Sequence, residues 1–209
     1  PTSGRIHLPG SIQSQLALGT DLTEGILPDS LRFQKIAGRG RINLLFLIDT
    51  SGSILADHRF ANVKGYIISL LENSYARKIH VAIIRYGGGT ASLELPFTTS
   101  AELAAKKIEG LRGGGSTPLI PALGIAAGIL DRMKEEHVHI YLLSDGRYDR
   151  SRTGHENRQI REFGSRCRAG DVPVTFINAG AATRTARARS AFLARLLQAE
   201  CIPLEDLRA

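Results

Sequence analysis

Three apolar segments restrict the fold of this chain more than any other feature of its sequence. The segments "RINLLFLI" from residue 41, "IHVAIIRY" from residue 79 and "VHIYLLSD" from residue 138 carry apolar side chains at both odd and even positions. A strand with this pattern is buried on both faces, as in a parallel sheet covered by helices. Amphipathic segments follow the strands, and the first has Phe60, Val63, Ile67, Leu70 and Leu71 on one helical face. The sequence therefore predicts an α/β fold with a doubly wound, mainly parallel sheet and helices on both faces.

The later part of the chain continues this alternation. Pro203, in the last predicted strand, indicates a sheet edge, because proline cannot donate a ladder hydrogen bond. After Gly87–Gly89 we expect the strand "TASLEL" in an antiparallel edge hairpin. Helices should follow over about 100–111, from Pro118 onward and over about 156–169. The chain should then form the strand "VPVTFINAG", a helix around 189–199 and the short strand "ECIPL".

Residues 1–40 differ from the rest, because they are irregular and rich in Gly, Pro and Ser. We expect an extended lead-in there, with a short strand or hairpin around "SIQSQLAL", and one domain over residues 41–209. The segment "PTSGRIHLPG" has no apolar core of the kind found in signal peptides, and no apolar run approaches the roughly 18 residues of a membrane span.

Net charge and cysteine content indicate what kind of partner the chain binds and in which compartment it resides. The net charge is +7 and arginines cluster between Arg147 and Arg195, but few aromatic residues accompany them and the chain has no Trp. We therefore expect these arginines to lie on solvated helix faces and to meet some acidic partner surface, rather than nucleic acid. Only two cysteines, Cys167 and Cys201, occur in a chain of 209 residues. They indicate a reducing compartment, the cytoplasm, although one disulfide remains an alternative.

Two of the buried strands end in a carboxylate. Asp49 follows "LLFLI" and opens the run Asp-Thr-Ser-Gly-Ser, so that Ser51 and Ser53 place two hydroxyls on the same tight loop. Asp145 ends "VHIYLLSD", and Thr117 follows the glycines of "GGGSTP". The carboxyl ends of parallel strands lie along one edge of a sheet, so these side chains should converge. A set of oxygen ligands alone favours a hard cation, and we predict a Mg²⁺ site, with Mn²⁺ as a second candidate, at Asp49, Ser51, Ser53, Thr117 and Asp145.

Other interpretations of the same residues stay open. Helix capping would explain one of these hydroxyls, and Thr117 could cap the helix that Pro118 begins. A strand-end aspartate is also the nucleophile of some phosphoryl-transfer enzymes, but that chemistry needs a second carboxylate where this chain has Ser51.

Some further residues lie near the predicted site or resemble metal ligands. His137 and His139 have a spacing that could bind a metal, but without a third ligand we expect ordinary strand residues, and we expect His58 to face solvent. For Tyr148 and Asp149, contact with a partner and plain loop surface are equally good interpretations.

The three-part pattern resembles a known family. Asp-x-Ser-x-Ser after an apolar strand, a threonine in a glycine-rich loop and a strand-terminal Asp-Gly are similar to the von Willebrand factor A (integrin I-like) domain, over about residues 41–205. The resemblance implies that the five residues named above form a metal-ion-dependent adhesion site, which grips a carboxylate of a partner protein. The domain itself would then be non-catalytic.

A narrower resemblance suggests a cellular role. The segments "LRFQKIAGRGRINLLFLIDTSGSI", "VAIIRYGGGTASLELPFTTSAELA", "GGGSTPLIPAL", "LLSDGR" and "FLARLLQAECIPLEDL" are similar to the C-terminal domain of the magnesium-chelatase D subunit and its cobalt-chelatase relatives. This implies an adaptor that couples an AAA+ ATPase, which would offer an acidic residue to the metal, to metal insertion into a tetrapyrrole by a large chelatase subunit.

The chain departs from the chelatase pattern in two ways. Ser116 stands between the glycines and Thr117, which leaves open which hydroxyl coordinates the metal. The AAA+ module of a full D subunit is missing, and the chain has no P-loop sequence, so the chain does not hydrolyse ATP through one. It is therefore either an excised domain or a stand-alone adaptor for another MoxR-like AAA+ ATPase outside tetrapyrrole metabolism.

Overall fold

The computed structural model describes residues 5–6, 33–34, 41–51, 59–72, 79–111, 114–133, 136–149, 154–180 and 183–204. Two compact units divide the chain, one over residues 1–40 and one over residues 41–209. In the first unit, β1 (Arg5–Ile6) pairs antiparallel with β2 (Phe33–Gln34). The strand or hairpin predicted around "SIQSQLAL" lies outside the described residues.

The second unit is built on a six-stranded sheet with the order β5-β4-β3-β6-β7-β8. Neighbouring strands are parallel except β4 and β5, which form the antiparallel edge hairpin. This arrangement confirms the predicted fold class, and Pro203 lies in the edge strand β8, as predicted. The strands are β3 (Ile42–Asp49), β4 (Ile79–Gly87), β5 (Thr90–Thr98), β6 (His137–Ser144), β7 (Val174–Asn178) and β8 (Glu200–Pro203).

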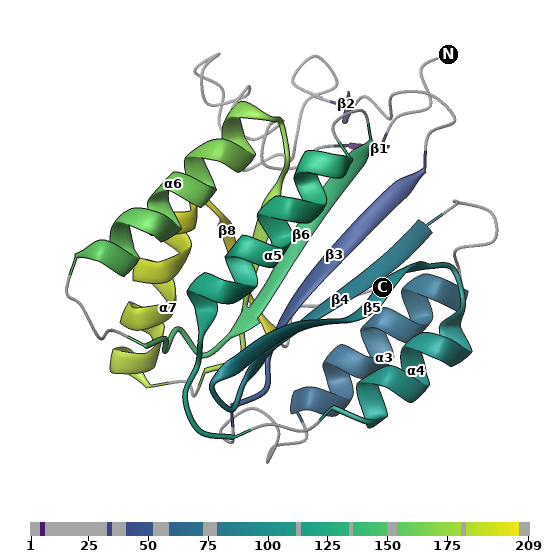
Figure 1. The fold of residues 1–209 in the computed structure, drawn as a ribbon, viewed down its shortest axis with the longest axis horizontal. Coiled ribbons are helices and arrows are strands. Elements are labelled where there is room, and N and C mark those ends of the chain that lie inside the picture. Colours follow the sequence, from purple (N-terminus) through teal and green to yellow (C-terminus); the bar gives the residue numbers. More distant parts are fainter. Residues whose placement is uncertain are drawn as a thin grey trace, which may run out of the picture. The chain divides into compact units, whose positions relative to one another are not determined.

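Helices cover both faces of this sheet, and Figure 1 shows α5 and α6 in front of it. Alternate side chains of β3 divide the core, because Leu45 and Leu47 pack with α5, α6 and α7, whereas Phe46 and Ile48 pack with α3 and α4. The helices are α3 (Arg59–Glu72), α4 (Ala101–Glu109), α5 (Leu119–Arg132), α6 (His155–Ala169) and α7 (Arg184–Leu197).

The start of α7 differs from the sequence prediction. The helix begins at Arg184 rather than near residue 189, because the hydroxyl of Thr183 accepts the Ala186 N–H at 3.2 Å and caps the first turn. Cys167 is buried, Cys201 is exposed and both are free thiols. Within the described residues, no helix is both long and apolar enough to cross a membrane.

Candidate metal site

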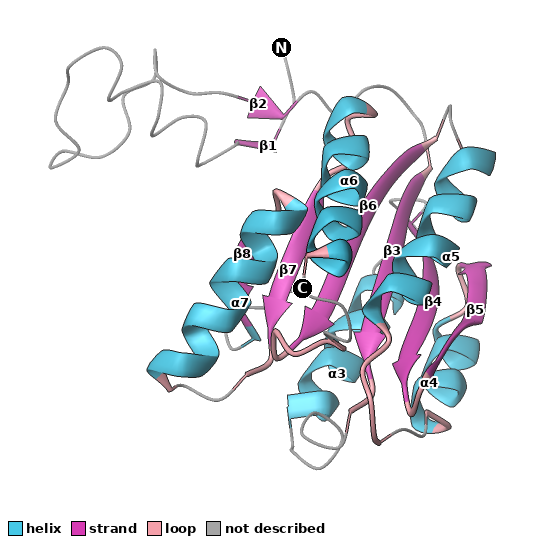
Figure 2. Cartoon of the chain, turned by 60° about the vertical axis from the view of Figure 1, so that its left-hand side comes forward, coloured by secondary structure: helices cyan, strands magenta, loops and turns pink. Residues whose placement is uncertain are grey.

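Asp49 and Asp145 lie at the carboxyl ends of two neighbouring parallel strands. Asp49 is the last residue of β3, and Asp145 directly follows β6, which pairs with β3 in register from Ile42 to Ile48. Figure 2 shows the ends of β3 and β6 side by side at one edge of the sheet. Both side chains belong to buried residues, with exposed fractions of 0% for Asp49 and 5% for Asp145. The sheet therefore brings two carboxylates together out of bulk water.

Burial makes Asp49 an unusual carboxylate. Desolvation raises its pKa to about 6, and the nearby negative charge of Asp145 adds to this effect. Hydrogen bonds act in the opposite direction: Oδ1 accepts the Ser51 N–H at 2.8 Å and Oδ2 accepts the Ser144 hydroxyl at 3.2 Å. The Ser144 oxygen in turn accepts the Gly146 N–H at 3.1 Å. Both oxygens of Asp49 thus have fixed directions.

Asp145 and Thr117 are joined by the loop that follows β6. Asp145 accepts the Arg147 N–H at 2.9 Å and pairs with the Arg147 guanidinium at 3.3 Å. Farther along, the Asp149 carboxylate accepts the Thr117 N–H at 3.2 Å, and the Thr117 carbonyl accepts the Asp149 N–H at 3.2 Å. This reciprocal pair fixes the loop of Thr117 to the loop of Asp145.

Thr117 and Ser116 have different environments, which bears on the alternative that the sequence left open. Thr117 is buried at 6% exposure, whereas Ser116 is exposed and lines a shallow hollow of about 540 Å³ together with Gly88 and Gly89. The position that caps α5 is held by Pro118, and no side chain makes a cap hydrogen bond there. Capping therefore does not account for Thr117, and we carry Thr117 forward as the candidate ligand.

Residues of β4 contact the loop that follows β3 and hold it in place. The Thr50 N–H donates to the Tyr86 carbonyl at 2.9 Å, and the Tyr86 hydroxyl donates to the Leu143 carbonyl at 3.2 Å. Gly87 is in close contact with this loop, since a Cβ at Gly87 would lie 2.4 Å from Thr50 Oγ1. Ser51, at the start of the loop, is buried at 9% exposure. Ser53 and His58 lie outside the described residues.

Apart from Asp149, the other described residues singled out in the sequence do not join this site. Tyr148 is buried in the core at 7% exposure and its hydroxyl bonds to Asn157, so neither of its two interpretations, contact with a partner or plain loop surface, is right. His139 stacks on Tyr141, with 4.4 Å between ring centroids, and its Nε2 lies 2.8 Å from the Thr175 hydroxyl. Among the described residues, no cluster of three His, Cys, Asp or Glu side chains could hold a metal.

Sequence reasoning missed the residues that orient the predicted ligands. Ser144 and Asp149 both contact a predicted ligand, and Tyr86 holds the neighbouring loop. Ser144 gave a signal as a polar residue between an apolar run and Asp145, and Asp149 was noted near the site, but the sequence did not predict that it would orient Thr117. The donor set itself fits a hard divalent cation, because the candidate ligands that the structure describes offer only oxygen and the two buried carboxylates repel each other.

Comparison with known proteins agrees with this geometry. The family model of the von Willebrand factor type A domain matches residues 44–147. The magnesium-chelatase 60 kDa subunit of Cereibacter sphaeroides is 32% identical over 171 residues, which cover 77% of this chain and 30% of that subunit. The chain thus spans less than a third of that relative's length.

Two solved structures share the fold at low sequence identity. One is proximal thread matrix protein 1 of the mussel byssus with a zinc-occupied MIDAS motif, which has a TM-score of 0.60 and 18% identity over 80% of this chain and 43% of the other. The second is the manganese-loaded Plasmodium vivax TRAP protein, with a TM-score of 0.54 and 18% identity over 71% of this chain and 62% of the other. The chain therefore carries a von Willebrand factor type A domain and resembles magnesium-chelatase subunits over most of its length.

Proposed function

We propose that this domain binds Mg²⁺ through Asp49, Ser51, Ser53, Thr117 and Asp145 and thereby binds an acidic residue of a partner protein. The observation that carries the proposal is the pair of buried carboxylates, Asp49 and Asp145, at the ends of adjacent strands. The largely exposed Arg147 guanidinium offsets the charge of Asp145 alone, so burying both carboxylates without a further cation is costly. Zinc and manganese in the two structural neighbours support a divalent ion, and the oxygen ligands favour Mg²⁺ or Mn²⁺ here.

The residues of this chain have distinct roles in the proposal. Asp49 and Asp145 supply the negative charge, and Ser51 and Thr117 supply neutral oxygens. Ser144 and Asp149 do not bind the ion but fix the direction of Asp49 and the position of Thr117. A bound Mg²⁺ would supply an open coordination position that attracts an incoming carboxylate.

Calorimetric titration of Mg²⁺ and Mn²⁺ into the domain tests this proposal. We expect one saturable site in the wild type, its loss in Asp49→Asn and Ser51→Ala, and an unchanged site in Glu102→Gln, which removes an exposed acid on α4. A ligand at about 100 times its Kd adds about 2.7 kcal/mol, so Mg²⁺ should also raise the Tm by about 5–10 °C. Equal binding in the wild type and Asp49→Asn would refute the site.

The wider role follows from the chelatase resemblance. We propose that the domain serves a chelatase-type complex in a reducing compartment such as the cytoplasm, where an AAA+ ATPase offers the acidic residue and a large subunit inserts the metal into a tetrapyrrole. The similarity to a magnesium-chelatase subunit supports this role. Purified chelatase AAA+ subunit should bind the immobilised domain in Mg²⁺ and be released by EDTA. Saturable Mg²⁺ binding without any capture of that subunit would leave the metal site standing and favour an adaptor for another MoxR-like ATPase.

A phosphoryl-transfer role for Asp49 is less compatible with the geometry. Asp49 has an exposed fraction of 0%, and each of its carboxylate oxygens accepts a hydrogen bond. A nucleophile must reach the phosphorus of its substrate, which this burial prevents. Turnover of a generic phosphate ester that is lost in Asp49→Asn would reverse this conclusion.

A further inference from the structure

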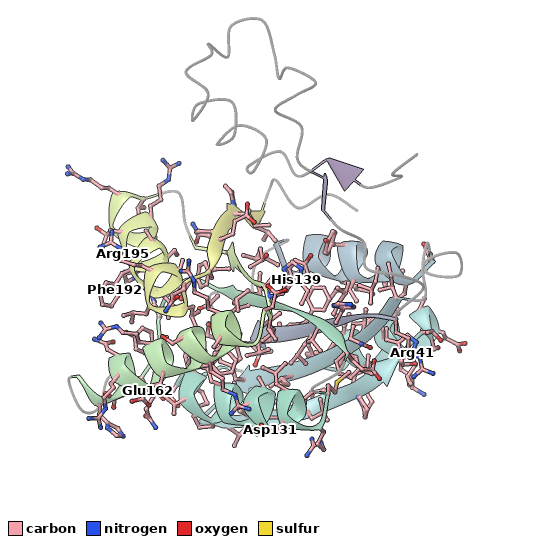
Figure 3. The ribbon with its side chains drawn as sticks, turned by 90° about the horizontal axis from the view of Figure 1, so that it is seen from above. Arg41, Asp131, His139, Glu162, Phe192 and Arg195 are labelled. Carbon is pink, nitrogen blue, oxygen red and sulfur yellow. The ribbon has the colours of Figure 1, made fainter. Side chains whose placement is uncertain are left out.

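The exposed face of α7 carries positive charge only. The helix contains four arginines and no acidic residue. At about 100° per residue, its exposed positions fall on one arc of about 160°. This arc, which we call the α7 face, consists of Arg184, Thr185, Arg187, Ala188, Ala191, Phe192 and Arg195. Figure 3 shows Phe192 and Arg195 on the side of α7 that is turned away from the sheet.

Three arginines of the α7 face lack, within the described residues, the ion pairs that two arginines of α6 form. On α6, Arg158 lies 3.8 Å from Glu162, and Arg166 pairs with Asp131 of α5. Arg184, Arg187 and Arg195, by contrast, form no ion pair within the described part of the chain. Their charges are therefore available to an external acidic group.

The α7 face also carries apolar side chains. Phe192 is 39% exposed, although large aromatic side chains are usually buried, and the short side chains of Ala188 and Ala191 leave the helix surface beside it flat. Arginine and exposed aromatic side chains on one surface are typical of protein interfaces. A single phenylalanine on a convex helix gives no row of rings for stacking nucleic-acid bases.

The α7 face also has a fixed position relative to the candidate metal site. A Cβ on Gly146, the residue after Asp145, would lie 2.7 Å from the Ser190 backbone nitrogen of α7. The backbone of α7 is thus in direct contact with the loop that follows β6. Figure 2 shows α7 at the margin of the sheet, beside β7 and β8.

We infer that the α7 face is a docking surface for an acidic amphipathic segment of a partner protein. Glutamate or aspartate side chains of that segment form bidentate pairs with Arg184, Arg187 and Arg195, and an apolar side chain covers Phe192. This surface acts without the metal, so the inference goes beyond the proposed function and does not depend on it.

Fluorescence anisotropy with a labelled peptide tests the inference. The probe is a synthetic helix-forming peptide with glutamates on one face and leucines on the other. A scrambled peptide of the same composition and a single-stranded DNA of the same charge serve as comparisons. EDTA is present throughout, so the metal site does not contribute. Titrations are run at about 0.1 M and about 1 M salt, over which the Debye length falls from about 10 to about 3 Å.

Two triple variants of equal charge separate a specific surface from net charge. Replacing Arg184, Arg187 and Arg195 by Gln should weaken binding of the amphipathic peptide about tenfold at the lower salt, which is about 1.4 kcal/mol. Replacing the exposed α6 residues Arg158, Arg161 and Arg168 by Gln should change it less than about twofold.

A separate variant tests the apolar part of the surface. Phe192→Ser should weaken binding of the amphipathic peptide about threefold, because apolar burial is lost, and leave binding of the scrambled peptide unchanged. Thermal unfolding of each variant checks that α7 remains folded.

Three results would overturn the inference. Equal loss in the two triple variants would mean that net charge alone attracts the peptide. Tighter binding of the DNA, lost only in the α7 variant, would mean that the surface binds nucleic acid. Absence of any peptide binding at the lower salt would mean that the α7 face is not a docking surface. In each case, a successful Mg²⁺ titration would leave the proposed function intact.

Discussion

A single methyl group at Gly87 should disturb the candidate metal site without touching any proposed ligand. In Gly87→Ala the new Cβ would lie 2.4 Å from Thr50 Oγ1 and 3.1 Å from the Thr50 carbonyl carbon. Thr50 has an exposed fraction of 0% and stands between Asp49 and Ser51 in the sequence. The contact therefore falls on the backbone that orients both side chains.

The size of the effect follows from this contact. The optimal van der Waals separation of nonbonded atoms is about 3.5 Å, so Thr50 or Gly87 must move by about 1 Å. The Thr50 N–H is bonded to the Tyr86 carbonyl at 2.9 Å, which opposes movement of the loop. Overpacking of this kind costs about 1–3 kcal/mol, and a disturbed supporting shell typically weakens metal binding about 10- to 100-fold. We expect both effects in Gly87→Ala.

Calorimetry with Mg²⁺ and urea unfolding in EDTA measure the two effects separately. Gly124→Ala is the matched control, because its Cβ on α5 would meet no atom within 4 Å. Thr50→Ala combined with Gly87→Ala removes the closer of the two contacts, and it should recover part of the Mg²⁺ affinity relative to Gly87→Ala alone. Wild-type Mg²⁺ affinity in Gly87→Ala, or no coupling between the two substitutions, would refute the reasoning.

Three further predictions concern the site and the core. Ser144→Ala should lower the free energy of unfolding by about 1–3 kcal/mol and weaken Mg²⁺ binding, because it removes a hydrogen-bond partner from both Asp49 and the Gly146 N–H. An unchanged urea midpoint would contradict this. Burial lowers the pKa of His139 from 6.5 to about 4, so the unfolded chain binds its proton first and stability falls as pH drops from about 6.5 to about 4. Urea titrations at pH 7 and pH 4.5 measure this fall in the free energy of unfolding. In His139→Phe the fall should be smaller than in the wild type by about 2 kcal/mol or less, since the ring is partly exposed. An equal fall in the two proteins would count against the lowered pKa of His139. Gly65→Ala, at an exposed position of helix α3, should raise the free energy of unfolding by up to about 1 kcal/mol, seen as a Tm rise of about 2–4 °C, because nothing lies within 4 Å of the new Cβ.

The convergence of Asp49 and Asp145 followed from the sequence, whereas the contacts that orient them did not. Each carboxylate ends an apolar run, and parallel pairing of β3 with β6 then determines where both must lie. The pairing of Asp149 with Thr117 joins residues 32 positions apart through two loops, and no periodicity encodes it. The same limit explains the error at Tyr148, because burial in a loop depends on the path of the chain rather than on a repeating pattern.

The two proposed surfaces have opposite charge, and this difference implies an order of events. The recessed carboxylates of Asp49 and Asp145 repel an acidic partner until a cation neutralises them, whereas Arg184, Arg187 and Arg195 attract it without one. An acidic segment should therefore meet the α7 face first, in a contact that salt weakens and EDTA does not. Binding of the acidic residue at the metal site would follow only in the presence of Mg²⁺. Salt should weaken this second contact less, because the site is buried. Salt and chelator thus act on different steps of the same encounter.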